Sequence, residues 1–288
     1  MTDPFEEHRG LLFTVAYEML GSVADAEDVL QDSWLRWDHA AQDEVRDPRA
    51  YLVRLVTRQA LNRLRTVKRQ RETYVGPWLP EPLATTPDVA EDVELADSVS
   101  VAMLVVLETL TPLERAVFVL REVFGYEYDE IAGATDRTAD AVRQLASRAR
   151  KHVQARRPRV ELPPDAAEVT ERFLTAVRTG DVERLMQVMA PDVLLVTDGG
   201  GVKQAALRPI EGAEKVARWF VGVASGVEGF GVEWTTANGR PGVLLLVDGV
   251  LDTFGTVVVE DGRLKALYLV RNPDKLGHLT RPRDLTRR

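Results

Sequence analysis

The chain has 288 residues, a formal net charge of −8 and no cysteine. This length predicts two or three domains, and the absence of cysteine excludes disulfides and thiolate metal sites. The histidines are scattered, so neither a metal site nor a cofactor is expected; they are His8, His39, His152 and His278. Because no apolar run approaches the roughly 20 residues of a membrane span and no signal pattern is present, we expect a cytoplasmic protein with no membrane partner.

The negative net charge hides blocks of opposite charge along the chain. Residues 21–44 are acidic, residues 46–71 are strongly basic, and residues 81–114 contain no Lys or Arg. Basic residues return from Arg115 onward and are densest between residues 137 and 159. Blocks of this kind indicate separate surfaces that serve separate partners.

Two helices are predicted before residue 40. Helical apolar spacing from Phe5 ends at Gly21, and an acidic helix starts at Ser22 or Asp25. The outward side of the acidic helix is predicted to carry Asp25, Asp28, Gln31, Asp32 and Leu35. An acidic helix with an exposed apolar position is typical of a docking surface for a basic partner. A solvated helix whose tryptophans belong to the core explains the same pattern.

The next segment predicts one long basic helix, with Asp47 as its cap and Pro48 in its first turn. One stripe, within an arc of roughly 80°, contains Tyr51, Arg54, Arg58, Asn62, Arg65 and Arg69. Arginines with an aromatic residue suit phosphates and unstacked bases. The alternative, a solvated basic face, would normally carry carboxylates four residues away. None occurs between Asp47 and Glu72, which favours a nucleic-acid surface.

Residues 76–97 predict a proline-containing acidic linker between this first domain (residues 1–75) and a second one (residues 98–158). Within the linker, Trp78 and Leu79 either anchor it to a neighbouring domain or are incidental. Residues 88–109 are predicted as one helix that enters the second domain. Thr111 and Glu114 predict a capping box for the following helix, which ends at Gly125.

The stretch from Tyr126 to His152 predicts two helices joined by a tight turn at residues 133–136, with Thr138 as the second N-cap. The buried flank of the second helix is predicted to contain Val142, Leu145, Ala146, Ala149 and Val153. The opposite flank contains Arg143, Gln144, Ser147, Arg148 and Lys151. This pattern predicts a helix-turn-helix whose second helix enters a major groove, where Arg pairs with guanine and Gln with adenine. An ordinary helical hairpin with a solvated basic face is the alternative.

Residues 165–288 predict a third domain of different composition. Helices over residues 166–180, 181–192 and 211–224 combine with a run of strands that we expect to be antiparallel. This pattern predicts an α+β half-barrel with helices packed in its mouth. Candidate groups for its pocket are Asp198, Asp248, Asp252 and Tyr268. Because aspartates beside glycine usually serve turn geometry and no catalytic constellation is present, no enzyme activity is expected.

The order and charge of the first 157 residues resemble the extracytoplasmic-function sigma factors of bacterial RNA polymerase. The resemblance is carried by DAEDVLQDSWLRW, DPRAYLVRLVTRQALNRLR, the acidic linker and the helix ending in RARKHV. It implies a sigma region 2 domain, a sigma region 4 helix-turn-helix domain, and core RNA polymerase and promoter DNA as partners. By the same resemblance, the helix around Asp25 to Trp37 docks on the clamp helices of the polymerase. Contacts to the −10 region are implied for Tyr51, Arg54, Arg58, Asn62 and Arg65, and contacts to the −35 region for Arg137, Thr138, Arg143, Gln144, Ser147 and Arg148.

The third domain resembles the SnoaL-like (ketosteroid-isomerase-like) fold, which one group of these sigma factors carries as an extension. The marks of that group are Trp78-Leu79-Pro80-Glu81-Pro82, Asp198-Gly199-Gly200-Gly201 with Lys203, and Asn272-Pro273-Asp274-Lys275-Leu276. The resemblance implies that these are interdomain segments through which the extension modulates the sigma half. Ordinary turn chemistry is the alternative. With no enzyme activity expected, the pocket of the third domain is either vestigial or holds an unidentified small ligand.

Two other functions remain open at this point. One is a ligand-responsive DNA-binding regulator that acts without polymerase, which leaves the Tyr51–Arg69 stripe unexplained. The other is a SnoaL-like enzyme with a DNA-binding appendage. The acidic net charge favours the polymerase-dependent function, because a free chain of this charge should bind promoter DNA weakly at physiological salt.

Overall fold

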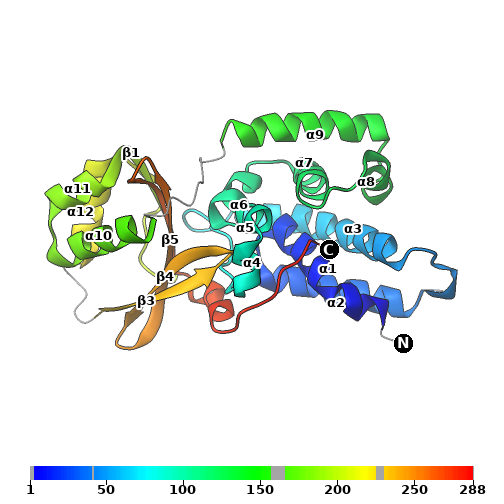
Figure 1. Cartoon of the computed structure of the whole chain (residues 1–288), viewed down its shortest axis with the longest axis horizontal. Helices are drawn as coiled ribbons and strands as arrows, with labels where there is room; N and C mark the ends of the chain where they lie inside the picture. The colour runs from blue at the N-terminus through cyan, green and yellow to red at the C-terminus, as the bar shows by residue number, and fades with distance from the viewer. Residues whose placement is uncertain (1–2, 41, 157–165, 225–229, 288) are drawn as a thin grey trace. The chain divides into compact units, whose positions relative to one another are not determined.

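The computed structural model describes residues 3–40, 42–156, 166–224 and 230–287 (Figure 1). These residues fall into two compact units. The first unit combines the described parts of residues 1–73, 85–157 and 283–288, and the second combines those of residues 74–84 and 158–282. The short segment 74–84 therefore belongs with the C-terminal fold, although both of its neighbours in the chain belong to the first unit.

The first unit begins with three helices that pack against one another: α1 (Pro4–Leu20), α2 (Val23–Asp38) and α3 (Pro48–Arg71). A short 3-10 turn, η1 (Gln42–Glu44), lies between α2 and α3. The predicted caps are confirmed. Gly21 ends α1 at a φ of 66°, the Ser22 side chain accepts the Asp25 N–H, and the Asp47 carboxylate accepts the Ala50 N–H.

Residues 87–108 form three short helices, so the single predicted helix was wrong. They are α4 (Pro87–Glu91), α5 (Val93–Ser98) and α6 (Val101–Glu108). The breaks lie at two residues whose side chains compete for the backbone. Asp92 accepts the Leu95 N–H and Ser100 accepts the Met103 N–H, so each starts a new helix.

The remaining helices of the first unit are α7 (Pro112–Phe118), the π-helical turn η2 (Val119–Val123), α8 (Tyr128–Thr135) and α9 (Ala139–Gln154). The capping box at Thr111 and the cap at Thr138 are confirmed. The break between α8 and α9 falls later than predicted. The helix continues through Gly133, and Asp136 makes the break with a φ of 55°, a conformation that aspartate tolerates better than most residues.

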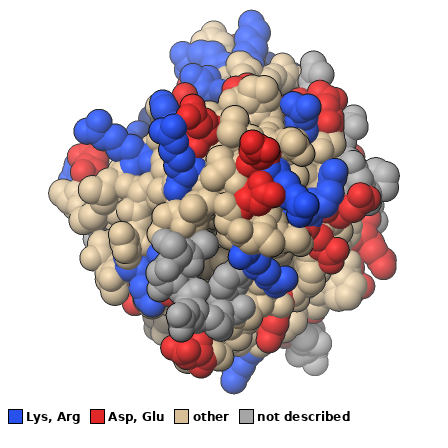
Figure 2. Space-filling model, turned by 90° about the vertical axis from the view of Figure 1, so that its left-hand side faces the viewer, with Lys and Arg blue, Asp and Glu red and all other residues tan. Residues whose placement is uncertain are grey.

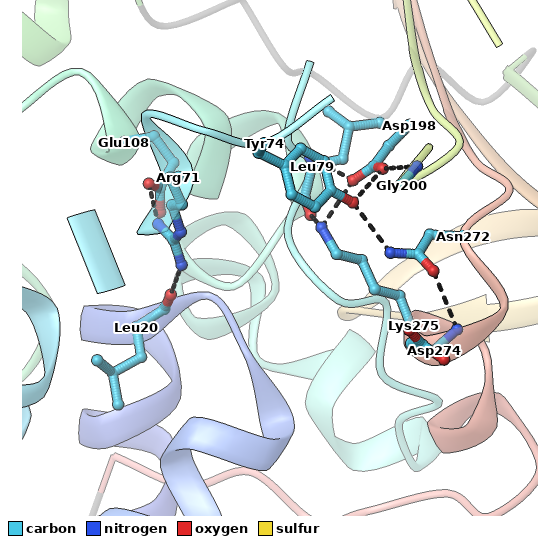
Figure 3. A network of polar contacts seen from close by, with 10 residues as sticks. All are labelled: Leu20, Arg71, Tyr74, Leu79, Glu108, Asp198, Gly200, Asn272, Asp274 and Lys275. Atoms are coloured by element: carbon cyan, nitrogen blue, oxygen red, sulfur yellow. Dashed lines mark hydrogen bonds and ion pairs between the residues drawn. The ribbon is translucent and has the colours of Figure 1, made fainter. Parts of the chain in front are cut away.

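A buried cluster of charges joins helices from both ends of the first unit. Arg115 on α7 is only 1% exposed and donates to the Glu18 carbonyl oxygen (3.0 Å) and to the Glu108 carboxylate. Arg71 donates to the other oxygen of Glu108 and to the Leu20 carbonyl (2.7 Å; Figure 3). Because each guanidinium satisfies a carboxylate and a helix-end carbonyl together, the cluster ties α1, α3, α6 and α7 together.

The Glu18 side chain is fully buried, and this burial raises its pKa to about 8. The Ser98 hydroxyl donates to it, and Arg115 and Arg287 are the nearby positive charges. The folded protein therefore holds a proton that the unfolded chain, with a pKa near 4.5, releases. Stability from this group is complete below pH 4.5 and is lost as the pH rises to about 8.

We expect the free energy of unfolding to fall with rising pH over this window, by up to about 1.4 kcal/mol per pH unit from Glu18. Glu18→Gln keeps a neutral side chain of the same shape, so its unfolding should lose most of this slope. Urea unfolding between pH 5 and pH 8 checks the prediction. An unchanged slope in the variant would show that another group is responsible.

In the second unit, three helices pack on one mixed sheet. The helices are α10 (Ala166–Thr179), α11 (Val182–Val188) and α12 (Ala213–Ala224). The strands are β1 (Met189–Asp198), β2 (Ile210–Glu211), β3 (Phe230–Ala237), β4 (Arg240–Val247), β5 (Val250–Glu260) and β6 (Arg263–Val270). Their order in the sheet is β2-β1-β6-β5-β4-β3. A core of buried apolar side chains lies between helices and sheet and includes Phe173, Leu185, Val216, Phe220 and Leu267.

The sequence predicts a fully antiparallel sheet, and this prediction is wrong for one pair of neighbouring strands. β3 to β6 form consecutive hairpins, whose two-residue turns contain Asn238-Gly239, Asp248-Gly249 and Asp261-Gly262 at positive φ. β1, however, pairs with β6 in parallel. Parallel neighbours need a long crossover, which here contains α12 and the hairpins. The predicted fold class, helical domains followed by an α+β half-barrel, is confirmed.

The last described residues leave the C-terminal fold and pack on the first unit. Arg283 pairs with Glu27 on α2, the Thr286 N–H donates to the Thr14 hydroxyl (3.1 Å), and Arg287 pairs with Asp92 (2.7 Å). The predicted third domain of residues 165–288 is therefore longer at its C-terminal end than the compact unit that the contacts define. Among the described residues, no helix combines the length and the apolar character needed to cross a membrane.

Candidate functional site

The helix α9 presents the two flanks that its sequence predicts. Val142, Leu145, Ala146, Ala149 and Val153 are all buried. The opposite side chains are exposed: Arg137, Thr138, Arg143, Gln144, Ser147, Arg148 and Lys151. Arg148 is 66% exposed and lies 4.0 Å from Glu114, so only a weak ion pair holds it. Guanidinium and amide groups on one open helix face can bind base edges and phosphates.

The stripe on α3 is also largely exposed. Arg54, Asn62, Arg65 and Arg69 are exposed, while the Tyr51 ring is half-buried against Trp37, at 5.7 Å between ring centroids. Arg65 donates to the Asn62 side chain (3.3 Å).

Arg58 in this stripe has partners in the turn before α9. It donates to the Gly133 carbonyl oxygen (2.9 Å) and to the Asp136 carboxylate (2.6 Å). The side chains of Arg58 and Asp136 are 46% and 75% exposed. An exposed pair of this kind contributes at most about 1 kcal/mol, so phosphates can compete for Arg58.

The outward face of α2 combines acidic and apolar side chains. Asp28, Gln31, Asp32 and Leu35 are exposed, and Leu35 is 45% exposed. Trp34 was missing from the predicted face but is 39% exposed. Asp25 has an additional role, because its carboxylate accepts from Arg63 on α3 (2.7 Å) and helps to hold the two helices together.

Within the second unit, the segment 74–84 is held by a buried polar network, which we call the clasp: Tyr74, Leu79, Asp198, Asn272 and Lys275 (Figure 3). The Asp198 carboxylate is fully buried at the end of β1. One of its oxygens accepts from the Tyr74 hydroxyl (2.6 Å), and the other accepts from the Leu79 N–H (2.8 Å) and from Lys275 Nζ (2.7 Å). The Gly200 N–H also donates to the first oxygen (3.1 Å), so the linker, the C-terminal segment and the glycine turn all supply donors to one buried charge.

Lys275 completes the clasp from the other side. Its ammonium group, on a residue that is 5% exposed, donates to the Leu79 carbonyl oxygen (2.6 Å) and lies 4.1 Å from the centroid of the Trp78 ring. Asn272 Nδ2 donates to the Tyr74 oxygen (2.9 Å), and the side-chain oxygen Oδ1 of Asn272 accepts the Asp274 N–H (3.1 Å). Burial and the Asp198 carboxylate raise the pKa of Tyr74, so its hydroxyl keeps its proton.

The glycines after Asp198 are required by close packing. A Cβ on Gly199 would lie 2.2 Å from the Lys203 carbonyl oxygen, and one on Gly200 would lie 2.4 Å from Asn272 Nδ2. Gly200 and Gly201 also have positive φ angles of 61° and 74°. A larger residue at Gly200 would therefore push Asn272 away from the clasp, and one at Gly199 would displace the Lys203 backbone.

A second anchor holds the other end of the segment. Leu83 exchanges two hydrogen bonds with Asn238 in the β3–β4 turn: its N–H donates to the Asn238 side chain (3.0 Å) and its carbonyl accepts the Asn238 N–H (2.8 Å). Pro80 and the neighbouring residues 79–85 are buried. The apolar anchor Leu79, whose place the sequence left open, is therefore packed against the C-terminal fold.

Of the four residues predicted to line a pocket of the C-terminal fold, only one lines the cavity found there. Asp252 lines a cavity of the C-terminal fold, while Asp198, Asp248 and Tyr268 do not contribute to its lining. Lys203, predicted as an interdomain residue, pairs with Asp252 (2.9 Å) rather than with the clasp. Although burial raises the pKa of Asp252, hydrogen bonds from Lys203, Thr253 and Arg271 bring it down to about 2. The Asp252 carboxylate therefore stays ionised at neutral pH, and it is too weak a base to act as a general base.

Sequence reasoning missed two groups of residues. Tyr74 is separated from Asp198 by 124 positions, and no local motif marks it as a partner. Arg71, Glu108 and Arg115 are single charges on three different helices. No local pattern in the sequence marks these three residues as partners.

This chain is similar to known proteins over almost its whole length. Residues 4–70 match the family model for sigma-70 region 2, and residues 100–153 match the model for sigma-70 region 4. The chain is 38% identical over 286 residues to the ECF RNA polymerase sigma factor SigJ of Mycobacterium tuberculosis (strain ATCC 25618 / H37Rv), covering 94% of this chain and 91% of the relative. It is 29% identical over 276 residues to the probable ECF RNA polymerase sigma factor SigI of Mycobacterium tuberculosis (strain CDC 1551 / Oshkosh), covering 94% and 93%.

A solved structure gives the same result in three dimensions. The crystal structure of the Mycobacterium tuberculosis extracytoplasmic function sigma factor SigJ superposes with a TM-score of 0.75 at 36% identity, covering 94% of this chain and 96% of that one. Sigma factors bind core RNA polymerase and promoter DNA and are not enzymes. The chain therefore belongs to the extracytoplasmic-function sigma factors, which direct RNA polymerase to promoters, and it carries a C-terminal extension like that of SigJ.

Proposed function

We propose that α9 contacts the −35 element, that the α3 stripe contacts the −10 element, and that the outward face of α2 docks on core polymerase. The exposed Arg143, Gln144 and Arg148 support the first assignment, and the exposed Arg54 and Arg65 support the second. In contrast, the face of the molecule in Figure 2, on the side of α10–α12, carries acidic and basic side chains interspersed. A mixed surface of this kind attracts DNA less than a basic helix face does.

The C-terminal domain, in this proposal, modulates the sigma factor through the linker between its two DNA-binding regions. The buried clasp carries this assignment, because it fixes Tyr74 and Leu79 on the C-terminal fold by charge-assisted bonds. A linker held in this way limits the positions that the −10 and −35 surfaces can take. The test is promoter-dependent transcription by core polymerase with the full chain and with clasp variants. Identical transcript yields would remove the regulatory role.

Arg148→Ala should lower transcription from a −35-dependent promoter by about 5- to 150-fold, which corresponds to about 1–3 kcal/mol of lost contact. Run-off transcription with core polymerase measures the effect. Arg172→Ala, which removes an exposed arginine from α10, serves as the matched control and should have no effect. Equal losses in both variants would mean that Arg148 acts only through overall charge.

A further inference from the structure

The C-terminal fold contains a cavity of about 120 Å³ between α10, α12 and strands β4–β6. Its lining is predominantly apolar and includes Phe173, Val177, Trp219, Phe220, Leu245 and Leu269. Apolar cavities of about 150 Å³ stay dry and accept a benzene ring. The space is therefore of the size that holds one ring or a short branched chain.

The wall of the cavity is suited to a flat, apolar molecule. The Phe173 and Phe220 rings meet edge to face, with centroids 4.9 Å apart, and Trp219 meets Phe220 in the same way at 5.0 Å. Packed aromatic edges and faces attract another ring in an offset or edge-to-face arrangement.

The polar groups of the lining already have partners within the protein. The Asp252 carboxylate accepts from Lys203 (2.9 Å), from Arg271 (2.8 Å) and from the Thr253 hydroxyl (2.7 Å). The Thr170 hydroxyl donates to the Ala166 carbonyl oxygen (2.7 Å). Because these groups are satisfied, a charged ligand would lose its hydration without a new partner, and a neutral ligand is favoured.

Asp252, at the polar end of the cavity, is held by Lys203 and Arg271, which lie next to the two segments that form the clasp. The backbone N–H groups of Arg271 and Asn272 both donate to the Asp198 carbonyl oxygen, at 2.7 and 3.0 Å. Lys203 ends the glycine turn, and its N–H donates to the Gly199 carbonyl oxygen (2.9 Å). Asp252 therefore connects the cavity to the residues on both sides of the clasp.

We propose that this cavity binds a neutral, predominantly apolar molecule of about one ring, and that the Lys203–Asp252–Arg271 triad transmits its presence to the clasp. The binding site stands on the cavity alone, whereas the transmission rests on the proposed regulatory function. A ligand that shifts β5 at Asp252 changes the positions of Lys203 and Arg271, and with them the segments that hold Tyr74 and Leu79.

The binding step is tested on the full chain with toluene as the probe, benzoate as its charged counterpart, and thermal unfolding as the measurement. Toluene should raise the melting temperature and benzoate should not. Leu245→Trp fills the cavity and should abolish the shift. Leu244→Trp, on the opposite face of the same strand, should retain it. An equal toluene shift in wild type and Leu245→Trp, or no shift in wild type, would overturn the proposal.

Transmission is tested by run-off transcription with core polymerase, with and without saturating toluene. We expect a change in transcript yield of at least twofold in wild type and none in Leu245→Trp. Lys203 does not line the cavity. The Lys203→Met variant should therefore still show the thermal shift with toluene but lose the transcriptional response. A thermal shift with no transcriptional change in wild type would leave the binding site standing and overturn the transmission. If clasp variants transcribe like wild type, the regulatory function fails instead.

Discussion

Lys275→Met is expected to lower the free energy of unfolding of the C-terminal fold by about 3–5 kcal/mol, because it leaves the fully buried Asp198 carboxylate without its cation. Methionine fills a similar volume, so lost packing contributes little. Urea unfolding followed by tryptophan fluorescence measures the loss. Amide hydrogen exchange gives a local readout, since the Leu79 N–H that donates to Asp198 should exchange faster in the variant.

The matched control is Lys265→Met in the same fold. Lys265 pairs with Asp192, but that carboxylate is 71% exposed, so water screens the pair and its loss should change stability little. The double variant Asp198→Asn with Lys275→Met removes both charges and should recover part of the lost stability. A loss in Lys275→Met no larger than that of the control would show that the clasp does not depend on its buried charge.

The same variant also tests the proposed regulation. Transcript yield with core polymerase should change in Lys275→Met while Lys265→Met behaves like wild type. Tyr74→Phe removes one donor to Asp198 and keeps the ring next to Lys275, so its effect should have the same sign and be smaller.

Local features of this fold were predictable because local chemistry determines them. Gly21, Asp47, Thr111 and Thr138 end or begin helices through bonds that span only a few residues, and each was found where the sequence placed it. The two flanks of α9 followed from helical spacing alone. The exceptions also have a local cause. The spacing of apolar residues predicts one continuous helix, but Asp92 and Ser100 each cap a new helix within it.

Long-range partners could not be predicted in this way. The parallel pairing of β1 with β6 depends on a crossover of more than one element, and the alternation of apolar residues is the same for either direction. Motif resemblance marked the two segments that contain Asp198 and Lys275, but it did not pair these residues, and Tyr74 carries no motif and was missed. Lys203 was assigned to the same group by its motif, yet its side chain reaches Asp252 instead.

Arg115→Met is expected to lower the free energy of unfolding of the first unit by about 3–5 kcal/mol. Arg115 satisfies Glu108 and the Glu18 carbonyl oxygen together, and Arg71 alone cannot replace both bonds. Urea unfolding at pH 7 measures the loss. Arg150→Met is the control, because the pair of Arg150 with Glu122 is half-exposed and should contribute at most about 1 kcal/mol.

Acid titration separates lost charge from lost packing in Arg115→Met. Burial alone would raise the pKa of Glu108, but Arg115 and Arg71 outweigh it and hold the pKa below its ordinary value. The stability that Glu108 contributes is therefore present above the unfolded pKa and is lost as the pH falls through the folded one. In Arg115→Met the folded pKa rises, so less of the remaining stability should be lost on acidification. If wild type and variant lose the same amount between pH 6 and pH 3, the effect of Arg115 comes from packing and not from its charge on Glu108.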